Sequence, residues 1–537
     1  MLGIKNNEMK NFKLYTTALL AVILLLSSCS KQFDEYSVNP NKPLAVPPYL
    51  LLRNVLTSIP VFPDGDEERW SQFTCRNYTY YGNNQYWSGS ATLQYGTLNT
   101  IVAMEKEALR TTGSETNPYA ALAKFLKAYI FVNMSLKVGD LPMSEALQGL
   151  ANPTPKYDTQ KQVFIQSLQL LDESNTMLAG LINNADVSLQ GDIYFQEKIS
   201  GASTPLEALK HWQKVVNSFK LRVLIQLSNV ATDGELKVSQ LFTDVLSNPS
   251  KYPILEGLSD NLEFEYNQAY NQYPNNASNL GNDATRLNLA ATWVNTLSDL
   301  HDLRAMKVGE PSRGLGYEDT DFRSFVGSSS GLDLSTMYDL AGNGKLSLYN
   351  RKRYYDGYTA ENTFMVGYPE LCFNIAEAIN RGWVSGDAES WYRKGIESEF
   401  EFYGVVDGDN TVTFVRSGAT GPGDYISYTV PFSFTEYFAQ PAVAYDGNTE
   451  TGLNQILTQK YLAFARNSGL EGYYQWRRTG VPEFLTGSGT GNSGVIPLRF
   501  QYPSDELSTN PTNYKAAVQS QYGGDDNINA AMWLLGR

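Results

Sequence analysis

Residues 368–403 read YPELCFNIAEAINRGWVSGDAESWYRKGIESEFEFY, and this segment indicates the architecture of the chain better than any other. Its two ends, 368–381 and 388–403, have the length and apolar spacing of helices, and the turn at 382–387 is short and contains glycine. Two helices of this length joined by so short a turn must pack antiparallel. Such a pair is the unit of tetratricopeptide-type arrays, although no strict repeat of fixed length is visible here.

Three further helices are predicted upstream of this pair. Asn117 followed by Pro118 is typical of a cap and a first helical turn, and apolar residues recur at helical spacing until the sequence GDLP at 139–142. The pattern of Thr159 with Gln162 is a capping box that opens the second helix. A third helix is expected from Pro205 to about Val230.

Long segments with little periodicity separate these helices. They are rich in Tyr, Asn and Gly, and they cover residues 261–282, 309–358, 407–446 and 487–494. Loops of this length in a compact protein are usually functional. The run Thr411–Val415 favours a small hairpin and no large sheet. We therefore predict a mostly α fold with tetratricopeptide-type helix pairs and a loop-rich ligand-binding face.

The composition argues against several classes of function. The chain has 537 residues, with 56 Asp and Glu against 42 Lys and Arg, which gives a formal net charge of -14. A surface this acidic repels phosphate backbones, so we expect no nucleic-acid partner. Three cysteines and two histidines leave little material for zinc clusters, disulfide frameworks or histidine-based catalysis. We predict no metal site and no cofactor.

The N-terminal segment has the pattern of a lipoprotein signal peptide. Lys10 and Lys13 precede an apolar run at 18–26, which is too short to span a bilayer as a helix. The run ends in Leu26-Ser27-Ser28-Cys29, which resembles a bacterial lipobox with Cys29 as the site of lipid attachment. An ordinary signal peptide with an unrelated cysteine is the alternative. We expect a signal peptide at 1–28, a lipidated leash at 29–48 and a single domain at 49–537.

Two short motifs match enzyme patterns but lack the required context. Residues 327–331, GSSSG, match a nucleophile elbow, and Gly489, Gly491 and Gly494 match a dinucleotide-binding fingerprint. Both lie in low-complexity loops without the strand and helix that such sites need. The acidic turn with Asp64, Asp66 and Glu68 is more typical of a solvated turn than of a calcium site. We assign no catalytic residue.

Carboxylate pairs of the glycosidase type are defined by their separation in space, so the sequence does not reveal them. Glu370 and Glu377 lie seven residues apart on one face of a predicted helix. For such helix acids, solvated or capping roles are more common than catalysis. A glycoside hydrolase that uses a carboxylate pair stays open as an alternative function.

The aromatic loops are a better indication of function. Residues 77–87 read NYTYYGNNQYW, and smaller clusters are formed by Tyr266, Tyr270 and Tyr273 and by 354–358. Tyrosine and tryptophan rings offer a flat apolar face with a polar tip, which suits stacking on sugar rings or packing against peptides. The alternative for each ring is that it anchors its loop to the core.

Several segments together resemble one known family, the SusD/RagB family of nutrient-binding outer-membrane lipoproteins, and in particular its SusD-like branch. The segments that carry this resemblance are Asn39-Pro40-Asn41, Gly139-Asp140-Leu141-Pro142, Pro155-Lys156-Tyr157-Asp158, Asn217-Ser218-Phe219-Lys220-Leu221-Arg222, Glu377-Ala378, Gly382-Trp383, Glu471-Gly472, Trp476-Arg477-Arg478-Thr479-Gly480 and Tyr502-Pro503. They span nearly the whole mature chain. The shared motifs look structural, and Trp476 and Arg477 are expected to pack and pair inside the body.

The resemblance implies a SusD-like helical fold and a function without catalysis. It implies a lipoprotein of the outer membrane, exposed at the cell surface, that captures oligosaccharides or peptides for a SusC-like TonB-dependent transporter. Glycan-binding members use an arc of aromatic side chains, for which this chain offers Trp70, Tyr80, Tyr81, Tyr86 and Trp87 in its early loops. A lipid-anchored glycoside hydrolase and a structural adaptor of the tetratricopeptide type are the alternative functions.

Overall fold

The computed structural model describes residues 45–536 except 64, 79–81, 86–88, 185, 420–422 and 466–468. Of residues 281–283 it describes only the backbone. Helices are the main regular structure in these residues. Residues 48–537 form one compact unit. The α-helices are α2 (Pro48–Ser58), α3 (Asp66–Trp70), α4 (Tyr95–Thr112), α5 (Pro118–Val138), α6 (Gln160–Ile182), α7 (Pro205–Gln226), α8 (Val238–Ser247), α9 (Leu280–Arg286), α10 (Ala291–Asp299), α11 (Arg304–Val308), α12 (Leu334–Gly342), α13 (Arg351–Tyr354), α14 (Tyr368–Asn380), α15 (Ala388–Tyr403), α16 (Phe434–Phe438), α17 (Glu450–Ala463), α18 (Glu471–Thr479), α19 (Glu506–Thr509) and α20 (Pro511–Tyr522).

The predicted helix starts are confirmed by their caps. The side chain of Asn117 accepts the backbone N–H of Ala120 at 2.9 Å, and Pro118 follows as the first residue of α5. Thr159 and Gln162 form the predicted capping box of α6. The third predicted helix, α7, ends at Gln226 and is followed by a short 3-10 turn that reaches Val230. Local capping signals therefore locate these helices well.

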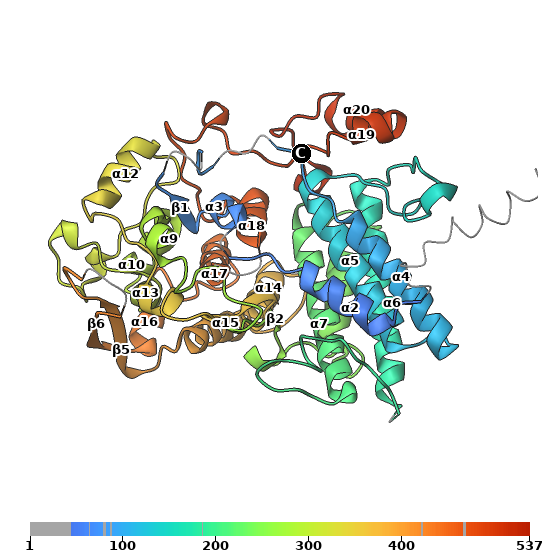
Figure 1. The fold of residues 1–537 in the computed structure, drawn as a ribbon, viewed down its shortest axis with the longest axis horizontal. Coiled ribbons are helices and arrows are strands. Elements are labelled where there is room, and N and C mark those ends of the chain that lie inside the picture. Colours follow the sequence, from blue (N-terminus) through green and yellow to red (C-terminus); the bar gives the residue numbers. More distant parts are fainter. Residues whose placement is uncertain are drawn as a thin grey trace, which may run out of the picture. The chain divides into compact units, whose positions relative to one another are not determined.

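The helices pack in sequence order. In Figure 1, α2, α4, α5, α6 and α7 lie side by side, and consecutive members of this group contact one another. Helices α14 and α15 pair closely across their short turn, as predicted, and α14 also packs on α7 and α17. Gly395 makes the pair close, because a Cβ at this position would lie 2.6 Å from the ring of Phe373. The mostly helical fold is confirmed.

The sheets are small. Within the described ranges every sheet has two strands: β1 (Thr74–Arg76) with β3 (Leu287–Leu289), β2 (Leu262–Phe264) with β4 (Thr363–Val366), and β5 (Gly408–Val415) with β6 (Tyr425–Phe432). All three pairs are antiparallel, and the last is the predicted hairpin, with Gly408 opposite Phe432 and Val415 opposite Tyr425.

The stretch 309–358 is more ordered than its sequence suggested. It contains α12 and α13, which begin with side-chain caps from Asp333 and Asn350. Only Met337 of α12 is buried, and the nine residues of this helix are fewer than the roughly 11–18 over which a helical period is recognised.

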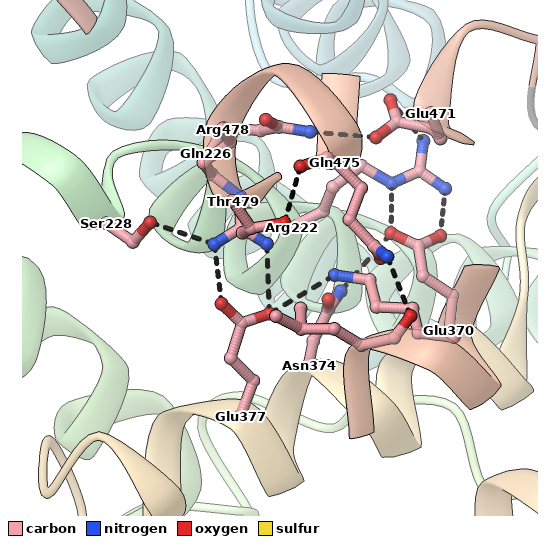
Figure 2. A network of polar contacts seen from close by, with 12 residues as sticks. Arg222, Gln226, Ser228, Glu370, Asn374, Glu377, Glu471, Gln475, Arg478 and Thr479 are labelled. Carbon is pink, nitrogen blue, oxygen red and sulfur yellow. Dashed lines mark hydrogen bonds and ion pairs between the residues drawn. The ribbon is translucent and has the colours of Figure 1, made fainter. Parts of the chain in front are cut away.

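A buried network of charged side chains joins four helices near the centre of the molecule. Figure 2 shows Arg222 of α7 directed at Glu370 of α14, with its Nε donating to the carboxylate at 2.6 Å. About two turns further along α14, the carboxylate of Glu377 accepts hydrogen bonds from the guanidinium of Arg478 of α18 at 2.5 and 3.0 Å. Lys460 of α17 lies 3.5 Å from the same carboxylate. The charges of four helices therefore meet along one face of α14.

This network corrects the expectation for Glu370 and Glu377. Solvated or capping roles were expected, but both carboxylates are buried in ion pairs. Burial favours the neutral acid, yet the cations of Arg478, Lys460 and Arg381 together lower the pKa of Glu377 well below its usual range. Arg477 is buried as predicted and donates to the carbonyls of Leu136 and Leu498, while the half-buried Trp476 packs on the core with its ring stacked on Phe484 at 4.9 Å between centroids.

Replacing Glu377 by glutamine should lower the free energy of unfolding by about 3–5 kcal/mol, because it leaves buried cations without their anion. Urea denaturation at neutral pH measures this change. Since the folded pKa of Glu377 is depressed, its contribution is fully present above the unfolded pKa of about 4.3 and is lost as the pH falls toward the folded value. The difference between the two proteins should therefore shrink below about pH 4.

The matched control is Glu397→Gln on α15, where the glutamate forms an exposed pair with Arg393 on the same helix. It should change the free energy of unfolding by less than about 0.5 kcal/mol. Equal effects of the two substitutions would contradict a central role for Glu377.

Candidate functional site

Trp70 is the single predicted ring of the early loops that lies within the described residues. Tyr80, Tyr81, Tyr86 and Trp87 lie outside them, as does Cys29. Trp70 ends α3, is partly buried, and meets the ring of Phe500 edge to face at 5.2 Å between centroids. Its ring therefore holds α3 against the C-terminal part of the chain, and a ligand contact by Trp70 stays a prediction.

Three buried amides hold the early loop on the body. Asn77 donates to the side chain of Asn288 at 2.6 Å and to the carbonyl of Thr285 at 3.0 Å. Asn84 accepts from the backbone N–H of Arg76 at 2.8 Å and donates to its carbonyl at 3.0 Å, as a paired strand would. Gln85 donates to the carbonyl of Arg69. All three amides therefore make hydrogen bonds within the protein, and these bonds anchor the loop.

Next to these anchors lies a cluster that we call the tyrosine platform, which consists of the exposed Tyr78 and Tyr338 and the half-buried Arg286. The Arg286 guanidinium lies 4.4 Å from the centroid of the Tyr78 ring, a distance typical of a cation–π contact. Tyr338, on α12, lies 6.4 Å from Tyr78 between ring centroids at an angle of 51°. The side chains of Tyr78 and Tyr338 are 38% and 56% exposed, so a ligand can reach both.

The sequence had not singled out Arg286 or Tyr338. They come from the end of α9 and from α12, more than 200 residues after Tyr78 in the chain. Strand β1 pairs with β3, and this pairing brings the residues before β3 beside those after β1. A polar helix that carries a tyrosine was the available signal, but it does not say which loop that tyrosine faces.

The other tyrosine clusters are largely structural. Tyr266, Tyr273, Tyr354 and Tyr355 are buried, which makes the core alternative correct for them. Tyr270 is 83% exposed and lines a groove of about 530 Å³. The remaining walls of this groove come from Arg53, Thr57, Phe62, Ile193, Glu197, Ile199, Phe264, Glu265 and Asn271.

The glycines of the two enzyme-like motifs serve close packing between loops. A Cβ on Gly331 would lie 2.2 Å from the carbonyl carbon of Thr486, and one on Gly489 would lie 2.1 Å from the carbonyl oxygen of Leu332. Both histidines pack on aromatic rings, as expected, with His211 on Phe195 and His301 on Phe322. Gly331 and Gly489 are therefore required by the close approach of two backbones, and this requirement explains the motif matches without chemistry.

The described residues contain no cluster of side chains suited to binding a metal ion. Among the described residues, no three His, Cys, Asp or Glu side chains gather closely enough to hold an ion. Asp66 pairs with Arg69 at 2.6 Å and Glu68 is buried, while Asp64 lies outside the described residues. The described helices also include none with both the length and the apolar character needed to cross a bilayer.

These features define a helical protein with two exposed tyrosines side by side, one from a loop and one from α12. Residues 65–503 match the model of the SusD-like family that is described as starch-binding and associating with the outer membrane. The chain belongs to this family. The resemblance based on short motifs is thereby confirmed over most of the chain.

Solved structures agree with this assignment. A SusD homologue from Bacteroides fragilis is 27% identical, covers 91% of this chain and 100% of its own, and superposes with a TM-score of 0.76. A second SusD homologue from the same species is 27% identical, with coverages of 92% and 100% and a TM-score of 0.73. A chitin-binding SusD homologue from Flavobacterium johnsoniae shares the fold at 17% identity, with coverages of 91% and 98% and a TM-score of 0.63. No curated protein matches the chain significantly.

Replacing Asn84 by alanine should lower the free energy of unfolding by about 1–3 kcal/mol, because the buried N–H and C=O of Arg76 lose their partners. Thermal and urea denaturation measure this loss. The control is Asn83→Ala in the same loop, whose partly exposed side chain should change stability by less than about 0.5 kcal/mol. If the two variants are equally stable, the amide of Asn84 does not anchor the loop.

Proposed function

We propose that this chain is a lipoprotein at the cell surface that binds nutrient oligosaccharides without cleaving them and delivers them to a SusC-like TonB-dependent transporter. The observation that carries the proposal is the tyrosine platform, an exposed set of rings beside a loop held by buried amides. The family description as starch-binding supports a glycan as the ligand. The name of the chitin-binding homologue points the same way.

The chemistry of the platform suits a saccharide. The C–H groups on the face of a pyranose ring pack on an aromatic face, while hydroxyl groups at its edge need hydrogen-bond partners. Tyr78 and Tyr338 offer both the ring face and a phenolic hydroxyl, and Arg286 adds N–H donors. Anchors at the base of the loop reduce the loss of conformational entropy on binding.

Attachment to the membrane is part of the proposal. A lipid on Cys29 would hold the protein at the outer membrane, because each buried methylene contributes about 0.8 kcal/mol and several acyl chains make the attachment stable. The association of the family with the outer membrane supports this location. The SusC-like partner follows from the family resemblance.

The glycosidase alternative loses its one named carboxylate pair. Glu370 and Glu377 are buried and neutralised by arginines, so neither carboxylate can approach a glycosidic bond. The binding experiment below detects cleavage by any other carboxylate pair through its products.

Replacing both Tyr78 and Tyr338 by alanine should weaken oligosaccharide binding by about tenfold to a hundredfold, since two stacking rings are lost. Isothermal titration against a panel of oligosaccharides and peptides gives the affinities, and mass spectrometry of the recovered ligands detects any cleavage. Tyr317→Ala is a closely matched control, because Arg323 lies 4.4 Å from the Tyr317 ring centroid, as Arg286 does from Tyr78. Unchanged affinity in the double variant would remove the platform from the site, and cleaved ligand would favour the hydrolase.

Replacing Cys29 by serine should move the protein from the membrane fraction to the soluble fraction, because serine lacks the thiol that carries the lipid. Fractionation of cells, followed by mass spectrometry of the N-terminal peptide, measures this. Gln32→Ala leaves Cys29 in place and should stay with the membrane. A Cys29→Ser protein that remains in the membrane fraction would contradict lipid anchoring at this residue.

A further inference from the structure

A pocket lined by arginines lies at the turn end of the β5–β6 hairpin, where β5 ends at Val415. Its volume is about 270 Å³, and its charged lining residues are Glu310, Arg313, Arg351 and Arg416. The rest of the wall is small or apolar, and consists of Pro311, Ala341, Gly344, Leu346, Leu348, Val415, Gly418 and Ala419. In a chain with a formal net charge of -14, three guanidinium groups and one carboxylate around one pocket are an unusual concentration of positive charge.

Two of the three arginines are paired with aspartates. Arg313 donates to Asp319 at 2.7 and 2.8 Å, and it also donates to the carbonyl of Val415 at 2.6 Å. Arg416 donates to Asp424 at 2.9 Å. These contacts hold both guanidinium groups in place and balance their charges.

The third arginine, Arg351, is different. Its buried Nε has no hydrogen-bond partner, and its guanidinium has no acid within ion-pair distance among the side chains that the structure describes. A buried N–H group without an acceptor is destabilising and rare in folded proteins. Arg351 is therefore the arginine of the pocket wall whose charge is not balanced by an ion pair with any of the described side chains.

Glu310 does not satisfy these donors. Its two carboxylate oxygens accept the backbone N–H groups of Arg351 at 2.9 Å and of Val415 at 3.0 Å. Burial raises the pKa of Glu310, although the two backbone bonds and the nearby Arg313 and Arg351 oppose that shift. The carboxylate thus fixes the backbone at the floor of the pocket and leaves the Arg351 side chain available.

The pocket is linked to the tyrosine platform by two short segments. Ala341 of the pocket wall follows Tyr338 by three residues on α12, a rise of about 4.5 Å along the helix. Leu348 of the wall forms a bridge with Asn288, two residues after Arg286 of the platform. The pocket and the platform are therefore built on the same two segments of the chain.

We infer that this pocket binds an anionic substituent, a carboxylate or a sulfate ester, of a saccharide whose neighbouring ring stacks on the tyrosine platform. Both groups present paired oxygens that match the planar fork of an arginine. The pocket is smaller than the range of about 300–1,000 Å³ that is usual for complete ligands, so it fits one charged unit of a longer chain. The inference rests on the proposed function, because it names the ligand class of the same surface.

Electrophoresis of the full-length mature protein in native gels that contain polysaccharide tests the inference with matched pairs. Pectate is compared with highly methyl-esterified pectin, and dextran sulfate with dextran, so that each pair differs in charge on a similar backbone. The pectate and sulfate arms separate a carboxylate from a sulfate ester. We expect at least one anionic polymer to retard the protein more strongly than its neutral counterpart. Nonspecific retention is disfavoured by the negative charge of the protein.

Arg351→Gln should then weaken binding of size-defined fragments of the retarding polymer by about tenfold to a hundredfold in isothermal titration. Arg351→Lys, which keeps the charge but loses the fork, should be intermediate. Arg323→Gln is the control for net charge, because Arg323 is exposed and paired with Asp321 outside the pocket. Circular dichroism verifies that each variant is folded.

Several outcomes would overturn the inference. Retardation by neutral polymers alone would overturn it and leave the proposed function intact, as would equal affinities of wild type and Arg351→Gln. An equal loss in Arg323→Gln would assign the effect to net charge instead of the pocket. If no polymer in the gels retards the wild-type protein and the wider panel also shows no saccharide binding, the proposed function and the inference both fail.

Discussion

The buried ion pairs along α14 are the constraint on which the rest of the molecule depends. A charge removed from water is costly unless a partner of opposite sign lies at the correct distance and angle. Arg222, Glu370, Glu377 and Arg478 meet this condition only when α7, α14 and α18 pack in one arrangement, with Lys460 of α17 beside them (Figure 2). Apolar packing alone tolerates small shifts between helices, whereas these bonds do not. The loops that form the binding surface are attached to helices held in this way.

At the candidate site, too, buried polar groups are paired with partners inside the protein. Buried amides of Asn77, Asn84 and Gln85 make hydrogen bonds within the protein and hold the early loop, while the neighbouring Tyr78 is exposed. In the arginine pocket, two guanidinium groups are neutralised and that of Arg351 is not. A surface of this kind separates the polar groups that maintain the fold from those that can recognise a ligand.

Contacts could be predicted from the sequence only where the interacting residues are close together along the chain. Helix caps such as Asn117 and Thr159 act within one turn, so the sequence around them was sufficient. Arg222 and Glu370 lie 148 residues apart, and Gln226 and Glu471 lie 245 apart. The acids of α14 therefore looked like ordinary helix acids, and Tyr338 on its polar helix gave no sign that it meets Tyr78. The short α12 also escaped detection, because nine residues are too few to establish a helical period.

Short-range chemistry in the sequence was enough to predict the main helices, the β5–β6 hairpin and the family, because capping, apolar spacing and compact motifs are properties of neighbouring residues. Only the tertiary structure decided which tyrosines bind the core and which face solvent, since Tyr266 and Tyr273 are buried while Tyr270 between them is exposed. It also decided that Glu370 and Glu377 are internal ion-pair partners and that the charge of Arg351 is not balanced by an ion pair with any of the described side chains. The physical reason is that burial and charge compensation depend on groups that arrive from distant parts of the chain.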